Sequence, residues 1–203
     1  MIGIMADSHG QSETIQAALA VLTNYHCRPI YHLGDVCDST HPETVDACVT
    51  PLQEHRVMTI KGNNDHAIVA NYLDRKKPPV SPESLDYLKT LPLVQYYRNA
   101  LFVHSLPFVR QLGLSSMIGA MGNNEVHRFC KEFPKHILFR GHSHSSEIIC
   151  CRGQQTETRP LAPRESFNLT GNIPCVVTCG SLTRGLCMIW NPEEAVIKCL
   201  SLK

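Results

Sequence analysis

The sequence has no excess of charge of one sign and no hydrophobic run long enough to cross a membrane. Nineteen Lys and Arg balance eighteen Asp and Glu among 203 residues, and the formal net charge at pH 7 is +1. The balanced charge argues against a nucleic-acid-binding surface. No apolar stretch approaches the roughly 18 residues that a membrane-spanning helix needs, which argues against a membrane protein.

We also expect no secretory signal, because the first strand-like run begins at Ile2 and leaves no room for a charged leader. Hydrophobic residues make up 43% of the chain and charged residues 18%, a composition typical of globular proteins and not of disordered ones. We therefore expect one cytoplasmic globular domain spanning residues 1–203. The composition leaves the oligomeric state open.

The ten cysteines include no Cys-x-x-Cys pair, the spacing that a cysteine-based structural zinc site normally needs. Cys150 and Cys151 are adjacent instead. A chain of this size does not depend on disulfides for stability. We therefore expect reduced thiols that pack as small hydrophobic residues, including Cys48 and Cys130 on helical faces.

Short apolar runs alternate with helical patterns in the first part of the chain, which is typical of an α/β fold. Strands are expected at 2–5, 30–33, 57–60, 101–103 and 137–139, with intervening helices beginning near residues 12, 45, 81 and 123. After residue 145 the pattern changes to hairpins, with strands expected at 148–151, 175–178, 186–190 and 195–200. Residues 105–123 are either a mobile flap over a site or irregular packed structure.

Chemically active side chains follow five consecutive predicted strands. The motifs are Asp7-Ser8-His9-Gly10, Gly34-Asp35, Gly62-Asn63-Asn64-Asp65, His104-Ser105 and Gly141-His142-Ser143-His144. Each motif alone is equally typical of a turn or of a hydrogen-bonded core histidine. Loops beyond the carboxyl ends of strands gather at one edge of an α/β sheet, so the five together indicate a shared site.

The spacing of these residues favours a metal site. Asp7 and His9 are two residues apart, as are His142 and His144, and in an extended segment such residues point to the same side. The pooled donors are two carboxylates, one amide oxygen and four imidazoles: Asp7, His9, Asp35, Asn63, His104, His142 and His144. This mixture suits Mn, Fe, Zn, Co or Ni. Seven donors are too many for one catalytic ion, and they suit two ions about 3.5–4 Å apart.

The charge of such a centre predicts an anionic substrate. Two divalent ions held by two carboxylates and a shared hydroxide keep a net positive charge, and paired ions hold a phosphoryl group while the hydroxide attacks it. This chemistry needs no Ser or Cys nucleophile. The sequence has neither a Gly-x-Ser-x-Gly motif nor a phosphate-binding P-loop.

This ordered set resembles the pattern of the calcineurin-like metallophosphoesterase superfamily. The pattern is Asp-x-His, Gly-Asp, Gly-Asn-x-Asp/Glu, a lone His and Gly-His-x-His, and the resemblance covers most of the chain. It implies a two-sheet β-sandwich flanked by helices, with Asp35 bridging two metal ions. It also implies one ion held by Asp7, His9 and His144 with Asp35, and a second held by Asn63, His104 and His142 with Asp35.

Two further segments bear on the branch of the superfamily. The run Thr178-Cys179-Gly180-Ser181-Leu182 is similar to the Asn-Pro-Gly-Ser motif of the compact phosphodiesterase-type members, with Thr178-Cys179 in place of Asn-Pro. The superfamily's protein Ser/Thr phosphatases carry an Arg just after the second motif, where this chain has Ser39-Thr40. The resemblance therefore implies the compact phosphodiesterase-type branch.

Asn64 stands where many members of the superfamily have a His that acts as general acid toward the leaving group. An amide donates a hydrogen bond but delivers no proton, so poor leaving groups should lose some of the ~10²–10⁴-fold help of general acid catalysis. We assign Asn64 to this catalytic position, with His66 as an alternative proton donor. Ser105 also replaces the Gly that usually follows the lone His.

We expect an enzyme that hydrolyses a phosphodiester or an activated phosphomonoester through a dinuclear metal-bound hydroxide, with Mn²⁺ as the activating ion. The expected partner is a small phosphate-ester substrate, and neither nucleic acid nor a membrane is indicated. Loops near residues 66–80 and 105–123 would set specificity. The alternative is a protein-interaction scaffold of the same fold with little or no hydrolysis, like the retromer subunit of the superfamily.

Overall fold

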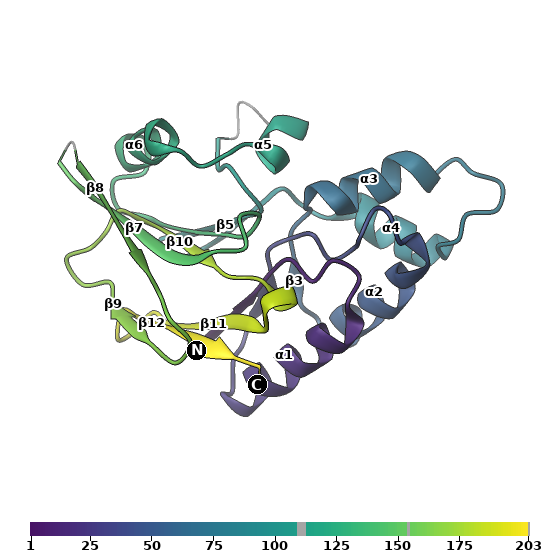
Figure 1. Cartoon of the computed structure of the whole chain (residues 1–203), viewed down its shortest axis with the longest axis horizontal. Helices are drawn as coiled ribbons and strands as arrows, with labels where there is room; N and C mark the ends of the chain where they lie inside the picture. The colour runs from purple at the N-terminus through teal and green to yellow at the C-terminus, as the bar shows by residue number, and fades with distance from the viewer. Residues whose placement is uncertain (109–112, 154, 203) are drawn as a thin grey trace.

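The computed structural model describes residues 1–108, 113–153 and 155–202, and two six-stranded sheets form its centre (Figure 1). Sheet A contains β1 (Ile2–Met5), β2 (Ile30–His32), β3 (Met58–Thr59), β9 (Ser166–Asn168), β11 (Leu186–Asn191) and β12 (Val196–Ser201). Sheet B contains β4 (Val94–Tyr97), β5 (Ala100–Val103), β6 (Ile137–Arg140), β7 (Ser146–Arg152), β8 (Gln155–Pro160) and β10 (Cys175–Cys179). The strand orders are β3-β2-β1-β11-β12-β9 and β4-β5-β6-β10-β7-β8.

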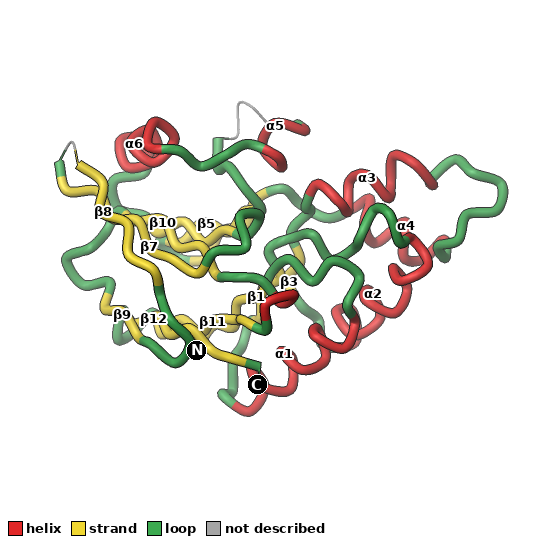
Figure 2. Tube along the Cα trace, in the orientation of Figure 1, coloured by secondary structure: helices red, strands yellow, loops and turns green. Residues whose placement is uncertain are grey.

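Helices cover the outer face of each sheet (Figure 2). Sheet A packs against α1 (Ser12–Asn24), α2 (Val45–Glu54), α3 (Asn63–Tyr72) and α4 (Pro82–Thr90). Sheet B packs against α6 (Asn123–Glu132), and the short α5 (Leu114–Ile118) precedes it in the chain. The short helices η1 (Pro42–Thr44) and η3 (Leu182–Arg184) complete the described elements. The layers therefore run helices, sheet A, sheet B, helix, which confirms the expected two-sheet sandwich flanked by helices.

The alternation of side chains along β1 explains why its four residues are all buried. Ile2 and Ile4 point between the sheets, and Met5 contacts the cluster beneath the helices. Between the sheets, the Phe102 ring lies 5.2 Å from the ring of Phe139, beside Trp190. Both faces of this strand exclude water, and the segment reads in sequence as an unbroken apolar run.

The structure contains the predicted elements that have a strong apolar pattern, and it also contains more polar elements that the sequence did not predict. Helix α1 buries the stripe of Ile15, Ala18, Leu19 and Leu22. Helix α3 was expected to be a turn and loop, so residues 66–72 belong to a helix and not to a specificity loop. Part of the segment 105–123 forms α5, and its residues 109–112 lie outside the described residues, so the choice between flap and packed structure stays open.

Two cysteines overturn the expectation of ten reduced thiols. Cys130 on α6 and Cys151 on β7 form a disulfide, because α6 packs on β7 and brings their Cα atoms to 6.6 Å, within the range that a disulfide spans. The other eight cysteines are free and buried, as predicted. Among the described residues, no helix has the length and apolar character needed to cross a membrane.

Candidate metal centre

All seven predicted donors lie at one edge of the sandwich. Strands β1, β2 and β3 run parallel in sheet A, and β5 and β6 run parallel in sheet B. The donors follow the carboxyl ends of these strands, so the loops of the two sheets face each other across the interface between them. This is the edge at which open α/β sheets bind ligands.

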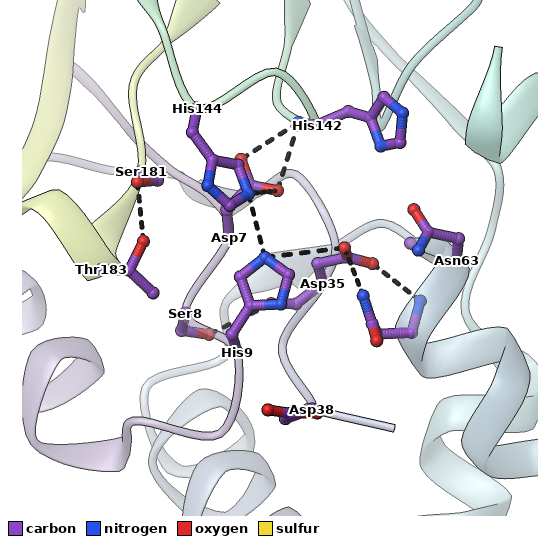
Figure 3. A network of polar contacts seen from close by, with 12 residues as sticks. Asp7, Ser8, His9, Asp35, Asp38, Asn63, His142, His144, Ser181 and Thr183 are labelled. Carbon is purple, nitrogen blue, oxygen red and sulfur yellow. Dashed lines mark hydrogen bonds and ion pairs between the residues drawn. The ribbon is translucent and has the colours of Figure 1, made fainter. Parts of the chain in front are cut away.

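One group of donors surrounds Asp7. The donor atoms of Asp7, His9 and His144 all lie within 4.8 Å of one another. The Nε2 atoms of His9 and His144 are 3.0 Å apart, and His144 Nε2 lies 3.7 Å from Asp7 Oδ1 (Figure 3). The backbone N–H of His142 donates to both carboxylate oxygens of Asp7, at 3.2 and 3.0 Å, which fixes the orientation of this carboxylate.

A second group surrounds His104. Its Nδ1 atom donates a hydrogen bond to the carbonyl oxygen of Leu33 at 2.8 Å, so Nε2 presents its lone pair. Nε2 faces Asn63 Oδ1 at 3.1 Å and Asp35 Oδ1 at 3.6 Å, and His142 Nδ1 lies 3.1 Å away. His104 Nε2, Asn63 Oδ1 and Asp35 Oδ1 are thus three electron-pair donors that converge on one point, an arrangement that fits a bound cation.

Asp35 lies between the two groups. Its Oδ2 atom is 3.8 Å from His9 Nε2, and its Oδ1 atom is 3.6 Å from His104 Nε2. The donor atoms of Asp7, Asp35 and His104 also lie within 4.8 Å of one another. Each oxygen of Asp35 therefore faces a different imidazole.

Asn64 holds Asp35 in this position. Its backbone N–H donates to Asp35 Oδ1 at 2.8 Å, and its Nδ2 donates to Asp35 Oδ2 at 2.7 Å. Its Oδ1 atom accepts a hydrogen bond from the Ser39 hydroxyl at 2.8 Å. The amide contacts the central carboxylate directly, while its assignment to the leaving-group position, like that of His66, stays a prediction.

The backbone of the donor loops is left-handed and not extended. The φ angles are +56° at Asp7, +44° at His9 and +54° at Asp35. They are +71° at His142 and +58° at His144. The extended geometry assumed for the two pairs is therefore wrong, although the members of each pair still lie at the same site. A non-glycine residue in this conformation costs roughly 1–2 kcal/mol, and such strain is concentrated at functional sites.

Two glycines allow the loops to approach each other. A Cβ atom on Gly62 would lie 2.2 Å from the backbone nitrogen and from Oδ1 of Asp35. A Cβ atom on Gly141 would lie 2.9 Å from Asp7 Oδ2. Neither position has room for a side chain, which explains the glycine beside the donor in the third and fifth motifs.

Burial dominates the electrostatics of the centre. Burial, followed by the charge of Asp35, raises the pKa of Asp7 to about 8. Burial lowers the pKa of His104 to about 4, and it also lowers the pKa values of His142 and His144. The neutral imidazoles are suited to ligate a metal, and a cation beside the buried Asp7 carboxylate would favour its charged form near neutral pH.

Two residues that support the centre were missed by the sequence analysis. Asp65 is fully buried and accepts hydrogen bonds from the backbone N–H groups of Asp35, Cys37 and Gly62, at 2.9–3.0 Å. It lies three residues after Gly62, the spacing of a helix-capping acid, and this signal was available in the sequence.

The second missed residue is Arg140, which is 3% exposed. Its guanidinium donates to the carbonyl oxygen of Ser105 at 3.2 Å and to the hydroxyls of Ser143 and Thr178 at 3.3 and 3.4 Å. It thereby connects the loop that follows β5 with the loop that follows β6. A charged residue ending the apolar run 137–139 was the only sign of this role in the sequence.

Comparison with known proteins identifies the family. Residues 1–160 match the model of the calcineurin-like phosphoesterase superfamily domain. No protein with a curated description matches the sequence.

Among solved structures, a metallophosphoesterase from Sphaerobacter thermophilus is similar with a TM-score of 0.78 and 18% identity, over 100% of this chain and 87% of that one. The protein PH1004 from Pyrococcus horikoshii OT3 is similar with a TM-score of 0.64 and 14% identity, over 99% and 88% of the two chains. A novel archaeal phosphodiesterase is similar with a TM-score of 0.51 and 13% identity, over 98% of both chains. These three likenesses concern the fold. The match over residues 1–160 shows that the chain belongs to the calcineurin-like phosphoesterase superfamily.

Proposed function

We propose that the protein is a hydrolase that uses two divalent metal ions, with Mn²⁺ as the activating ion, to cleave a phosphodiester or an activated phosphomonoester. The observation that carries the proposal is the position of Asp35, whose Oδ2 faces the His9 imidazole at 3.8 Å and whose Oδ1 faces the His104 imidazole at 3.6 Å. Bound ions would polarise the phosphoryl oxygens and lower the pKa of a coordinated water.

The residues of this chain would perform the remaining tasks. Asp7, His9 and His144 would hold one ion with Asp35, and Asn63, His104 and His142 would hold the other. The carbonyl oxygen of Leu33 fixes the ring of His104 through a hydrogen bond of 2.8 Å. The side-chain amide of Asn64 fixes the carboxylate of Asp35 through a hydrogen bond of 2.7 Å. Such outer contacts set the orientation of metal ligands and raise metal affinity.

The preference for good leaving groups follows from the contacts of Asn64. Its side-chain amide is hydrogen-bonded to Asp35 and Ser39 and has no acidic proton to donate to a leaving group. A phosphodiester with a weakly basic leaving group needs no protonation in the transition state, so this class of substrate suits the site best.

The test is a metal-reconstitution assay on the purified full chain. The protein is stripped with a chelator, dialysed against Mn²⁺, and then assayed for metal content and for hydrolysis of bis-p-nitrophenyl phosphate. We expect about two ions per chain, by analogy with other paired-metal sites, and hydrolysis that requires them. Metal binding without hydrolysis of any ester in a phosphate-ester screen would favour the scaffold alternative, and no bound metal would contradict the proposed hydrolase.

A further inference from the structure

A second cavity lies at the opposite end of the parallel strands, away from the metal centre. It has a volume of about 660 Å³ and is lined by residues 23, 26–30 and 54–56. These residues come from the loop from α1 to β2, the loop from α2 to β3, and the ends of the elements that these loops join. Because β2 and β3 are neighbouring parallel strands, with Tyr31 opposite Met58, the two loops lie side by side.

Each loop contributes one histidine and one arginine to the cavity. The first loop carries His26 and Arg28, and the second carries His55 and Arg56. All four residues are exposed, and Glu54 is the one acid among the lining residues. The cavity thus gathers positive charge in a chain whose total charge is nearly balanced.

The two helices end in the same way. At α1, the N–H of His26 bonds to Thr23 and that of Cys27 bonds to Leu22. At α2, the N–H of Arg56 donates to the carbonyl oxygen of Gln53, and the N–H of Val57 donates to that of Leu52. This is the Schellman motif, in which glycine is the usual residue at the left-handed position. His26 and Arg56 occupy that position with φ angles of +54° and +53°. Each position therefore has a side chain where glycine would adopt the left-handed backbone without strain.

Helix capping does not account for these side chains. Basic residues are favourable near the negative ends of helices, most directly when they hydrogen-bond to the last carbonyls. His55 does this, because its Nδ1 donates to the carbonyl oxygen of Pro51 at 3.0 Å. Within the part of the chain that the structure describes, the side chains of His26, Arg28 and Arg56 make no hydrogen bond or ion pair.

Free arginines are uncommon elsewhere in the molecule. Of the arginines in residues 1–108, 113–153 and 155–202, the side chains of Arg28, Arg56, Arg164 and Arg184 alone have no hydrogen bond, ion pair or ring contact. Two of these four line the same cavity. Guanidinium groups bind phosphate through paired charge-assisted hydrogen bonds.

We propose that this cavity is a binding site for a phosphomonoester dianion of about the size of a mononucleotide. Arg28 and Arg56 would contact the phosphate, with His26 beside them. The volume of about 660 Å³ is far larger than one phosphate ion requires, and it lies within the range of small-molecule sites. Cys27, Pro29 and Ile30 provide a less polar wall for the organic part of the ligand.

The test is calorimetric titration of the full chain with adenosine 5′-monophosphate, adenosine and inorganic phosphate, in the presence of a chelator. The chelator removes cations from the metal centre, so phosphate is not retained there. We expect the monophosphate to bind at least about tenfold more tightly than either adenosine or phosphate, because only it uses both the arginines and the wall. Equal affinity for adenosine and the monophosphate, or for phosphate and the monophosphate, would overturn the proposal.

The matched variants are Arg28→Gln/Arg56→Gln and the control Arg164→Gln. Arg164 is also exposed, unpaired and left-handed, with a φ of +71°, but it lies outside the cavity. We expect the double variant to lose about tenfold or more in affinity for the monophosphate while Arg164→Gln binds as the original chain does. Unchanged affinity in the double variant would refute the site, and equal thermal unfolding of the variants would show that folding is not the cause of any loss.

Discussion

The polar side chains at the two ends of strands β1–β3 differ in how far they are buried and in whether they have partners. At the carboxyl end, neighbouring acidic and imidazole side chains lie 3–4 Å apart; Asp7, Asp35 and His104 are buried, and the other three histidines are half-buried. At the amino end, the arginines and histidines are exposed, and three of the four have no partner among the described residues. Burial raises the pKa of Asp7 and lowers that of His104 at the first end, whereas the guanidinium cations of Arg28 and Arg56 at the second end are exposed. The contrast predicts a cation at one end of the sheet and an anion at the other.

The largest expected effect comes from neutralising the bridging carboxylate. Asp35→Asn keeps the size of the side chain but removes the charge between the two imidazole groups. Hydrolysis should fall by about 10³-fold, the scale of losing a main electrostatic contact to the transition state. Asp74→Asn, at an exposed acid of the loop after α3, is the control and should leave the rate unchanged. Near-normal hydrolysis by Asp35→Asn would contradict the dinuclear proposal.

A smaller effect is expected on acid stability through His32. This residue is fully buried at the end of β2, bonded to the Ser8 hydroxyl at 3.1 Å, and burial lowers its pKa from 6.5 to about 3. The unfolded chain therefore takes up a proton below pH 6.5 that the folded chain refuses. His32 alone should therefore lower folding stability by about 1.4 kcal/mol per pH unit as the pH drops from 6.5 toward 3, whereas the raised pKa of Asp7 acts in the opposite direction.

Urea unfolding of chelated protein at several pH values measures this dependence. His32→Gln removes this group, so the stability of the variant relative to the original chain should rise by about 1.4 kcal/mol per pH unit as the pH drops from 6.5. The control His41→Gln, at an exposed residue, should show no such change. The same slope in His32→Gln and in the original chain would show that another group causes the acid sensitivity.

Asn64→His tests the leaving-group argument, with a smaller effect again. The imidazole can supply a proton, but it replaces the amide that donates to Asp35 Oδ2. We expect the rate for alkyl phosphate monoesters relative to p-nitrophenyl phosphate to rise about tenfold, less than the full range of general acid catalysis. Since the ratio is measured within one variant, a general loss of activity cancels, and an unchanged ratio would count against the role of this position.

The smallest effect concerns the amino end of the strands. Arg56→Gly relieves the left-handed strain at the end of α2, and it should raise the free energy of unfolding by about 0.5 kcal/mol. Arg28→Gly, at a position without positive φ, should instead lower it slightly. If the first substitution also weakens binding of adenosine monophosphate, stability and binding oppose each other at this residue. Thermal unfolding and calorimetry on the same samples measure both.

The sequence predicted the parts of the fold that pattern alone determines. The stripe of α1 and the apolar run of β1 are periodic and buried, and hydrophobic burial gives them a clear signature. Strand β8 has no buried residue, and α3 buries little besides Asp65 and Ile68, so neither has an apolar pattern to recognise. These elements form because pairing with β7 and capping by Asp65 satisfy their backbone groups.

The candidate site was predictable in its composition and not in its geometry. The seven donors follow strand ends, which is a topological property that the order of motifs reveals. Their left-handed backbone was not predictable, because no glycine marks residues 7, 9, 142 or 144. The disulfide and the hydrogen bonds of Arg140 depend on segments far apart in the chain, and their geometry arises only when the sheets pack.

The pairing of β1 determines when the centre can assemble during synthesis. Ile2 and Ile4 lie opposite Trp190 and Met188, and the backbone of Ala6 accepts a hydrogen bond from Leu182. The first ligand loop to leave the ribosome thus gains its last neighbours from nearly the end of the chain. A nascent polypeptide that already carries all seven donors still lacks the strand that positions Asp7. The proposed metal ions would therefore be held only after β11 has been made, and retained metal would distinguish chains that contain residues 186–191 from chains that end before them.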